Sequence, residues 1–148
     1  MDILKFSKEH NLFRERLKAF LETEVTPHVA QWEKDHIVPK STWKKMGKAG
    51  FLCPMVATEY GGLGGNFLYS VIVGEELSYT VHSGLSANVH SDVVVPYLDS
   101  FGSKEQKKKY LPGCVSGDII TAIAMTEPDA GSDLAGMKTT AVEEDDHI

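Results

Sequence analysis

The chain has 148 residues, enough for one ordinary domain or for one domain with part of a second. Hydrophobic residues make up 42% of it and charged residues 24%, a balance that excludes an intrinsically disordered chain. The formal net charge is −6, which argues against nucleic acid as a partner because phosphate binding requires a basic surface.

The first part of the chain contains three predicted helices. Behind the potential cap Ser7, apolar residues recur at helical spacing, at Phe13, Leu17, Phe20 and Leu21. Thr26-Pro27 predicts a second helix that runs to about Asp35, because proline suits the first turn of a helix. A third helix is predicted over residues 41–49, and Gly50 stands where a glycine ends many helices.

A glycine-dense turn over residues 59–66 separates these helices from the next two. It lacks the Gly-Lys-Ser/Thr ending of a phosphate-binding loop, so we interpret it as a structural turn. Helical periodicity then resumes over residues 67–80 and again over residues 85–98. Within the latter, Val93–Val95 also suits a strand, because β-branched residues favour extended structure.

Ser103 and Gln106 have the spacing of a capping box and predict the start of another helix. We expect this helix to end at Pro112-Gly113. The two cysteines, Cys53 and Cys114, are too far apart in the sequence for a redox or zinc motif and are expected to be free thiols.

The character of the sequence changes after Asp118. Residues 119–125 are apolar and β-branched, which predicts a buried strand, and residues 139–142 predict a second one. Helices followed by strands indicate an α+β fold or two domains, and the fold class is mainly α because helices make up most of the chain. We therefore expect a helical domain over residues 1–117 and the start of a β-domain over residues 118–148.

A polar loop directly follows the first predicted strand, over residues 124–136. It contains threonine, serine, acidic residues and two glycines. Hydroxyls and free backbone N–H groups in a glycine-containing loop suit an anionic diphosphate. Composition alone is equally compatible with an ordinary polar β-turn.

The motif within this loop is specific. Met125-Thr126-Glu127-Pro128, then Ala130-Gly131-Ser132-Asp133-Leu134 and Gly136, resembles the signature of the acyl-CoA dehydrogenase family at the start of its middle β-domain. The glycine turn, Glu75-Glu76-Leu77 and the segment from Phe101 to Lys107 resemble the family in the same order. The resemblance spans nearly the whole chain and leans towards long-chain or branched-chain members.

This resemblance implies the family's fold, an N-terminal helical bundle followed by a β-barrel domain. It also implies FAD as cofactor and oxidation of an acyl-CoA thioester to the trans-2-enoyl-CoA, as in fatty acid β-oxidation and lipid metabolism. Six residues match cofactor-binding positions: Ile123, Ala124, Met125, Thr126, Gly131 and Ser132. Thr126 matches the threonine near flavin N5, and Ser132 also borders the CoA moiety. Asp129 departs from the family, which usually has glycine there.

The family's catalytic carboxylate belongs to a C-terminal helical domain that nothing in this sequence matches. We therefore name no catalytic residue and expect this chain alone to be inactive. Glu59, Glu75, Glu76 and Glu127 are not assigned that role. The resemblance further implies an electron-transferring flavoprotein as electron acceptor and a homotetramer for the full-length protein.

Two alternatives to this function remain open. One is a related flavin oxidase or monooxygenase with the same fold, and the other is a non-catalytic short form that acts as a folding or association module. No membrane partner is expected, since no apolar run is long enough to cross a bilayer. We expect a cytoplasmic location in a bacterium, or the mitochondrial matrix after processing.

The remaining polar residues have less specific patterns. The histidines lack metal-ligand spacing, so no metal site is predicted. His82 and His90 flank a segment that the resemblance places near the acyl pocket, but core or surface histidines are the more common case.

Overall fold

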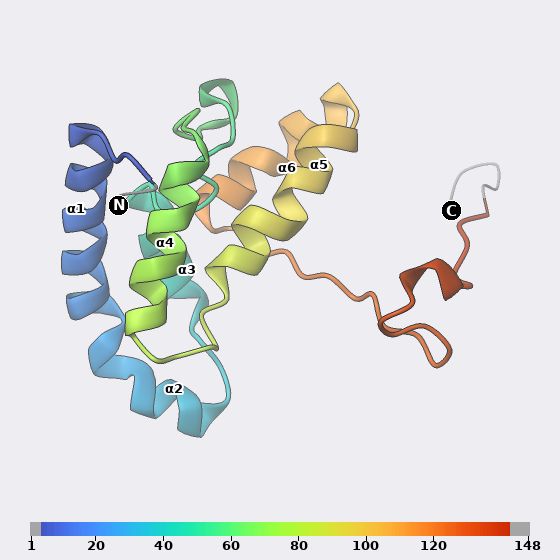
Figure 1. The fold of residues 1–148 in the computed structure, drawn as a ribbon, viewed down its shortest axis with the longest axis horizontal. Coiled ribbons are helices and arrows are strands. Elements are labelled where there is room, and N and C mark those ends of the chain that lie inside the picture. Colours follow the sequence, from blue (N-terminus) through green and yellow to red (C-terminus); the bar gives the residue numbers. More distant parts are fainter. Residues whose placement is uncertain (1–3, 143–148) are drawn as a thin grey trace.

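The computed structural model describes residues 4–142, and within them six α-helices form one packed body (Figure 1). The helices are α1 (Lys8–Glu24), α2 (Val29–Asp35), α3 (Lys40–Lys48), α4 (Phe67–Tyr79), α5 (Val95–Phe101) and α6 (Lys104–Ser116). Shorter 3-10 turns lie at Thr26–His28, Thr58–Tyr60 and Leu134–Gly136, and a π-helical turn at Val89–Val94 precedes α5. In the part of the chain that is described, no helix has the length and apolar character needed to cross a bilayer.

Helix α1 forms where the sequence predicts it, with Ser7 as its cap. The Ser7 hydroxyl accepts from the backbone N–H of His10, while the His10 ring accepts from the backbone N–H of Ser7. This reciprocal pair satisfies two of the donors that a helix start leaves free. The apolar stripe behind the cap is buried, and Leu17 is fully enclosed.

The core lies between α1 and α4 and between α3 and α6, with α5 packed along α6. Its members are apolar residues from every one of these helices and from the connector after α3. The largest fully buried apolar side chains are Phe51, Leu17, Met46, Leu52, Ile72 and Leu111. At about 25 cal/mol per Å² of apolar surface removed from water, burial of this kind dominates the stability of the bundle.

Backbone geometry explains why the turn over residues 59–66 is rich in glycine. Gly61 and Gly64 have φ angles of +91° and +60°, which glycine adopts without strain. A Cβ on Gly62 would lie 1.9 Å from the carbonyl oxygen of Val56. The turn therefore needs glycine to fold back on its own chain, in agreement with its interpretation as a structural turn.

The predicted end of the last helix at Pro112-Gly113 is wrong, because α6 continues to Ser116. Pro112 lies on the exposed face of α6, where water can solvate the carbonyl that loses its N–H partner. Leu111, Cys114 and Val115 are buried and hold the last turn against the core. The helix ends instead at Gly117, whose φ of +77° forms a left-handed C-cap.

The segment predicted as a helix over residues 85–98 is helical, so the strand alternative for Val93–Val95 is wrong. Its centre is a π-turn in which the backbone N–H of Val95 bonds the carbonyl of His90, five residues earlier. This wider turn falls directly before Pro96, whose ring and missing N–H would disrupt a regular α-helical turn.

After α6 the chain leaves the helical body as an extended segment (Figure 1). The strands predicted over residues 119–125 and 139–142 do not form: within residues 4–142 the backbone pairing outside helices is a single bridge, Glu127 with Ala130. A strand needs a hydrogen-bonded neighbour, and this segment has none in the described part of the chain. The end of the predicted β-domain, residues 143–148, lies outside the described residues.

Candidate functional site

The segment that carries the predicted cofactor residues folds into a compact turn of its own. The backbone N–H of Glu127 bonds the carbonyl of Ala130 at 2.9 Å, and the reverse bond measures 3.2 Å. Ala130 is buried inside this turn, with 1% of its surface exposed. The 3-10 turn Leu134–Gly136 then brings the chain back alongside the first part of the motif.

Glu127 fastens this turn to the residues that follow it. Its carboxylate accepts from the backbone N–H of Lys138 at 2.8 Å and from that of Thr139 at 3.1 Å. Hydrogen bonds from Thr139 and from the Lys138 backbone lower the pKa of the Glu127 carboxyl. A carboxylate that stays ionised and bound to two amides is a structural clamp, which agrees with its exclusion as a catalytic base.

Asp129 stands where a glycine is usual in the family that the motif resembles, and the structure shows how its charge is compensated. Its carboxylate pairs with the Lys138 ammonium at 2.7 Å, and both side chains are mostly exposed. The Lys138 ammonium thus compensates the carboxylate charge at the surface of the turn. The turn therefore tolerates aspartate at this position without an uncompensated charge.

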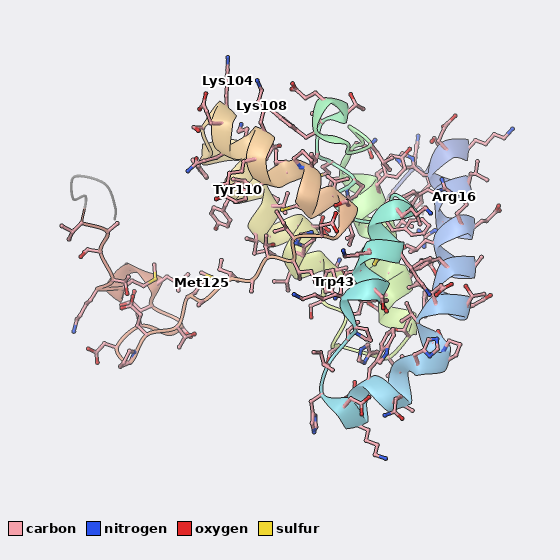
Figure 2. The ribbon with its side chains drawn as sticks, turned by 180° about the vertical axis from the view of Figure 1, so that it is seen from behind. Arg16, Trp43, Lys104, Lys108, Tyr110 and Met125 are labelled. Atoms are coloured by element: carbon pink, nitrogen blue, oxygen red, sulfur yellow. The ribbon has the colours of Figure 1, made fainter. Side chains whose placement is uncertain are left out.

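The six predicted cofactor residues lie on the surface of this segment, away from the helical body. They are all exposed: Ile123, Ala124, Met125, Thr126, Gly131 and Ser132. Figure 2 shows Met125 on the extended chain, well separated from Trp43 in the helical core. An exposed run of this kind presents its hydroxyls and backbone groups to whatever docks against it.

The residues around Gly131 suit an anionic ligand. A Cβ on Gly131 would meet no atom within 4 Å, so the packing of the described chain does not require glycine there. Among residues 4–142, no acceptor bonds the backbone N–H of Gly131 or of Ser132. Free amides beside an open glycine and a serine hydroxyl form a suitable cradle for a diphosphate. The donor set therefore fits the diphosphate of FAD.

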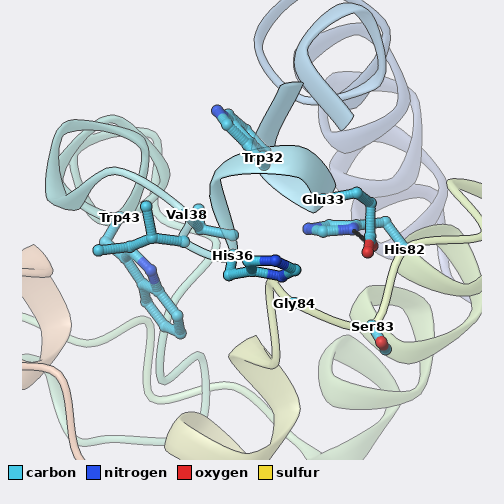
Figure 3. Close-up of a pocket in the computed structure, with 9 residues that line it drawn as sticks. Trp32, Glu33, His36, Val38, Trp43, His82, Ser83 and Gly84 are labelled. Atoms are coloured by element: carbon cyan, nitrogen blue, oxygen red, sulfur yellow. Dashed lines mark hydrogen bonds and ion pairs between the residues drawn. The ribbon is translucent and has the colours of Figure 1, made fainter. Parts of the chain in front are cut away.

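A cavity of about 420 Å³ opens between α2, α3 and the loop before the π-turn (Figure 3). His82 lines it and donates from Nδ1 to the Glu33 carboxylate at 2.6 Å. Nε2 of His82 is buried and has no hydrogen-bond partner among the described residues. A Cβ on Gly84 would lie 2.8 Å from this nitrogen, so backbone covers it. The ring edge is closed to a reactant, which favours a structural role.

A second histidine, His90, lies in the core and contacts a cysteine. Cys53 Sγ is 3.4 Å from His90 Nε2, a distance that resembles a nucleophile and its base. The pKa directions oppose that chemistry. Burial lowers the pKa of His90 and raises that of the Cys53 thiol to about 12. Both groups are therefore neutral at physiological pH, and the pair is part of the core.

Burial of neutral His90 predicts a pH-dependent stability. As pH falls below 6.5, the ordinary pKa of histidine, His90 binds a proton in the unfolded chain but stays neutral in the native protein. We expect the free energy of unfolding to fall from about pH 6.5 down to the lowered pKa of His90. Urea unfolding at about pH 8 and about pH 5.5 measures this change.

The control for this prediction is His90→Gln, which cannot titrate. Asp92 is charged and faces His90, and Cys53 and Cys114 are its other titratable neighbours. Burial raises the pKa of Asp92, so its own contribution to the free energy of unfolding decreases as pH rises, opposite in sign to that of His90. An equal loss of stability in wild type and His90→Gln would assign the pH dependence to another group.

Sequence analysis missed the contact between His90 and the segment that carries the site. His90 Nδ1 lies 2.9 Å from the Thr121 hydroxyl and accepts from the Thr121 backbone N–H at 3.1 Å. The sequence offers no local signal for this pair because the two residues are 31 positions apart. Among the described residues no group of three metal-ligating side chains could hold a metal ion.

Comparison with known proteins extends beyond this local geometry. Residues 7–118 match the family model described as the acyl-CoA dehydrogenase N-terminal domain. The long-chain specific acyl-CoA dehydrogenase of mouse mitochondria is 45% identical over 136 residues, which cover 92% of this chain and 32% of that protein.

Solved structures agree with this match. An acyl-CoA dehydrogenase from Geobacillus kaustophilus superposes with a TM-score of 0.89 at 53% identity, over 94% of this chain and 37% of that one. A glutaryl-CoA dehydrogenase from Mycobacterium smegmatis, in complex with FADH2, gives a TM-score of 0.83 at 28% identity, over 90% of this chain and 35% of that one.

The helical bundle thus defines a class of protein whose named relatives are acyl-CoA dehydrogenases. The chain belongs to the acyl-CoA dehydrogenase family and represents its N-terminal region. It spans about a third of the length of the relatives and solved structures that it matches.

Proposed function

We propose that this chain is the N-terminal part of an FAD-dependent acyl-CoA dehydrogenase that converts an acyl-CoA to the trans-2-enoyl-CoA. The observation that carries the proposal is the exposed turn after α6. Its backbone is fastened internally by Glu127, while Thr126, Gly131 and Ser132 are exposed and the amides of Gly131 and Ser132 have no acceptor among the described residues. The FADH2 complex among the matching structures supports a flavin as the group that this surface binds.

Under this proposal each residue has a defined task. Ile123 to Thr126 line the flavin ring, with the Thr126 hydroxyl oriented towards the N5 edge. Gly131 and Ser132 donate to the diphosphate, and Ser132 also borders the CoA thioester substrate. FAD supplies the hydride acceptor, and a neutral hydroxyl polarises the ring without adding a charge.

The proposal extends to organisation and partners. The helical domain ends at Gly117 and a β-domain begins at residue 118, as the break in helical structure after Ser116 supports. The protein takes part in fatty acid β-oxidation, assembles as a homotetramer and passes its electrons to an electron-transferring flavoprotein. The mouse mitochondrial relative and the bacterial structure support either a mitochondrial matrix or a bacterial cytoplasmic location.

Thr126→Ala tests the assignment of the turn. Removing one hydroxyl that bonds the flavin is expected to weaken FAD binding by up to about tenfold, since a net hydrogen bond contributes about 0.5–1.5 kcal/mol. Titration with FAD, followed by the visible flavin band and by quenching of flavin fluorescence, measures the affinity.

Thr140→Ala is the matched control, because Thr140 is an exposed threonine on the same segment outside the motif. Its FAD affinity should equal that of the wild type. Equal affinities for Thr126→Ala and wild type would reject the role of Thr126. A wild-type chain that leaves the flavin spectrum and fluorescence unchanged throughout the titration would reject flavin binding by this chain.

A further inference from the structure

The segment that carries the flavin turn is attached to the helical body at one place. Within residues 4–142, no hydrogen bond or ion pair links residues 122–142 to residues 4–118. Ile119 donates its backbone N–H to Gly113 at 3.0 Å, and Thr121 then bonds His90. Thr121 is therefore the last fastened residue before the turn.

The partners of His90 determine its tautomer. The backbone N–H of Thr121 can only donate, so His90 Nδ1 carries a lone pair and accepts from it at 3.1 Å. The Cys114 carbonyl can only accept, so Nε2 carries the proton and donates to it at 3.0 Å. The neutral ring thus uses both nitrogens, one on the helical body and one on the segment.

His90 is itself a fixed point of the structure. It is 1% exposed, and the Trp43 ring packs against it edge to face with centroids 5.7 Å apart. Its backbone belongs to the π-turn before α5, and its acceptor Cys114 lies in the last turn of α6. That carbonyl also accepts from the N–H of Gly117, the C-cap of α6, so His90 is tied to the end of this helix.

The position of Thr121 sets where the flavin turn begins. Thr126 is five residues further on, a span of about 17 Å in a fully extended chain. A small change in the backbone direction at Thr121 therefore produces a larger displacement at Thr126. A ligand that must meet both Thr126 and Gly131 binds more weakly when the residues that hold it are not ordered in advance.

We propose that His90 is a positioning residue for the flavin turn, acting through Thr121 to fix where residues 123–132 leave the helical bundle. The proposal rests on the function proposed above for that turn. Under this proposal His90 does not contact the cofactor. It orders the backbone of residues 123–132, which contacts the cofactor.

Two substitutions separate the nitrogens of His90. His90→Asn places an amide oxygen at the δ position, where it can accept from Thr121. His90→Gln places its amide at the ε position, where it can donate to the Cys114 carbonyl but leaves the Thr121 N–H without its acceptor. Both variants keep a neutral polar side chain in the core, so a general loss of packing would affect them alike.

Amide hydrogen exchange of the full chain is the decisive measurement, because it requires no flavin. We expect exchange of the Thr121 amide to be about tenfold faster in His90→Gln than in wild type and near wild type in His90→Asn, the effect of one lost hydrogen bond. Titration with FAD should show the same order, with His90→Gln about tenfold weaker.

The outcomes are distinguishable. Unchanged exchange of the Thr121 amide in His90→Gln, or faster exchange spread equally over the helices, would overturn the positioning role. The same holds if His90→Gln binds FAD as tightly as wild type. If wild type binds no FAD, the proposed function fails, and the exchange pattern alone still decides whether His90 holds the segment.

A second pair of variants covers the case in which His90→Gln does not fold. Thr121→Pro removes the backbone N–H that His90 accepts, outside the core, whereas Thr121→Val keeps it. The positioning role requires lower backbone NMR order parameters over residues 122–125 in Thr121→Pro than in Thr121→Val. Equal order parameters in the two variants would overturn it.

Discussion

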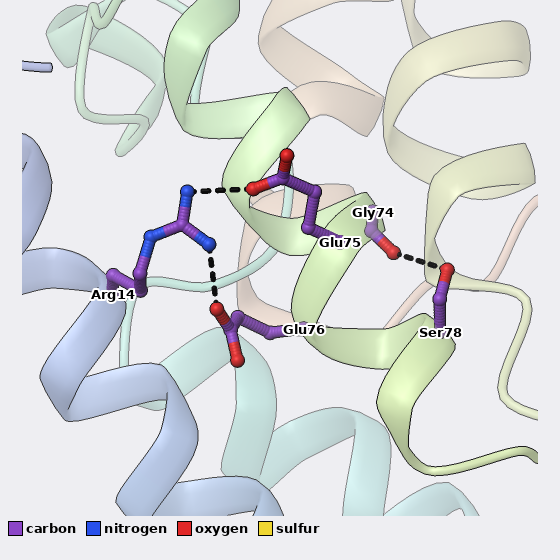
Figure 4. A network of polar contacts seen from close by, with 5 residues as sticks. All are labelled: Arg14, Gly74, Glu75, Glu76 and Ser78. Atoms are coloured by element: carbon purple, nitrogen blue, oxygen red, sulfur yellow. Dashed lines mark hydrogen bonds and ion pairs between the residues drawn. The ribbon is translucent and has the colours of Figure 1, made fainter. Parts of the chain in front are cut away.

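Replacing Arg14 with leucine is expected to destabilise the bundle by about 2–3 kcal/mol, because it leaves a buried carboxylate without its partner. Arg14 extends from α1 to α4 and bonds Glu76 and Glu75, each at 2.6 Å (Figure 4). Glu76 has 4% of its side chain exposed, whereas Glu75 has 47%. The loss at Glu76 therefore dominates, since exposed pairs contribute little. This loss of stability lies at or below the low end of the range for broken buried ion pairs, because Arg14 is itself partly exposed.

Urea unfolding followed by circular dichroism measures this change, with Lys18→Leu as control. Lys18 lies one turn further along α1, is exposed, and loses the same charge on substitution. Its stability should stay within about 0.5 kcal/mol of wild type. Adding Glu76→Gln to Arg14→Leu removes the stranded charge and should recover part of the loss. A double variant no more stable than Arg14→Leu would contradict this account.

The elements that sequence predicts well are those whose cause is local. The stripe behind Ser7 predicts α1, and the Ser103–Gln106 box predicts the start of α6, since both depend on residues three or four apart. The failure at Pro112 has a non-local cause. Burial of the next turn of α6 against α3 outweighs one missing backbone bond.

Contacts between distant residues escape sequence analysis for the same reason. The pairing of Arg14 with Glu76 spans 62 positions, and no periodicity announces it. The two acids lie side by side on α4 and share a contact to one arginine on α1. The predicted strands also depend on partners elsewhere, and in the described chain those partners do not exist.

The candidate site was predicted from a motif, whereas the contacts that hold the turn in place were not predicted. Asp129 in the motif forms an ion pair with Lys138 that the sequence did not predict. Glu127 and His90 hold that turn internally and at its origin. Both contacts depend on how the chain returns in space, so the cofactor-binding assignment of residues 123–132 remains a prediction for experiment.

Gly47→Ala is expected to destabilise the protein by about 2–3 kcal/mol, although alanine is the better helix former by about 1 kcal/mol. Gly47 is buried in α3, where a Cβ would lie 2.3 Å from the carbonyl atoms of Ser116 and 2.6 Å from the Val115 oxygen. These are backbone atoms of α6, which cannot move aside as a flexible side chain can. Steric overlap therefore outweighs helix propensity, and α6 must shift away from α3.

Gly74→Ala is the matched control, because Gly74 is also inside a helix but faces a side chain that can move. Its Cβ would meet the Asn88 amide at 3.1 Å and no backbone atom within that distance. We expect its unfolding midpoint in urea to lie close to that of wild type or above it. Gly47→Ala with a midpoint as high as that of Gly74→Ala would show that α3 and α6 can separate freely. Because the end of α6 bears the carbonyl that His90 bonds, the Gly47 variant should also speed amide exchange at Thr121, which links the packing of the bundle to the placement of the flavin turn.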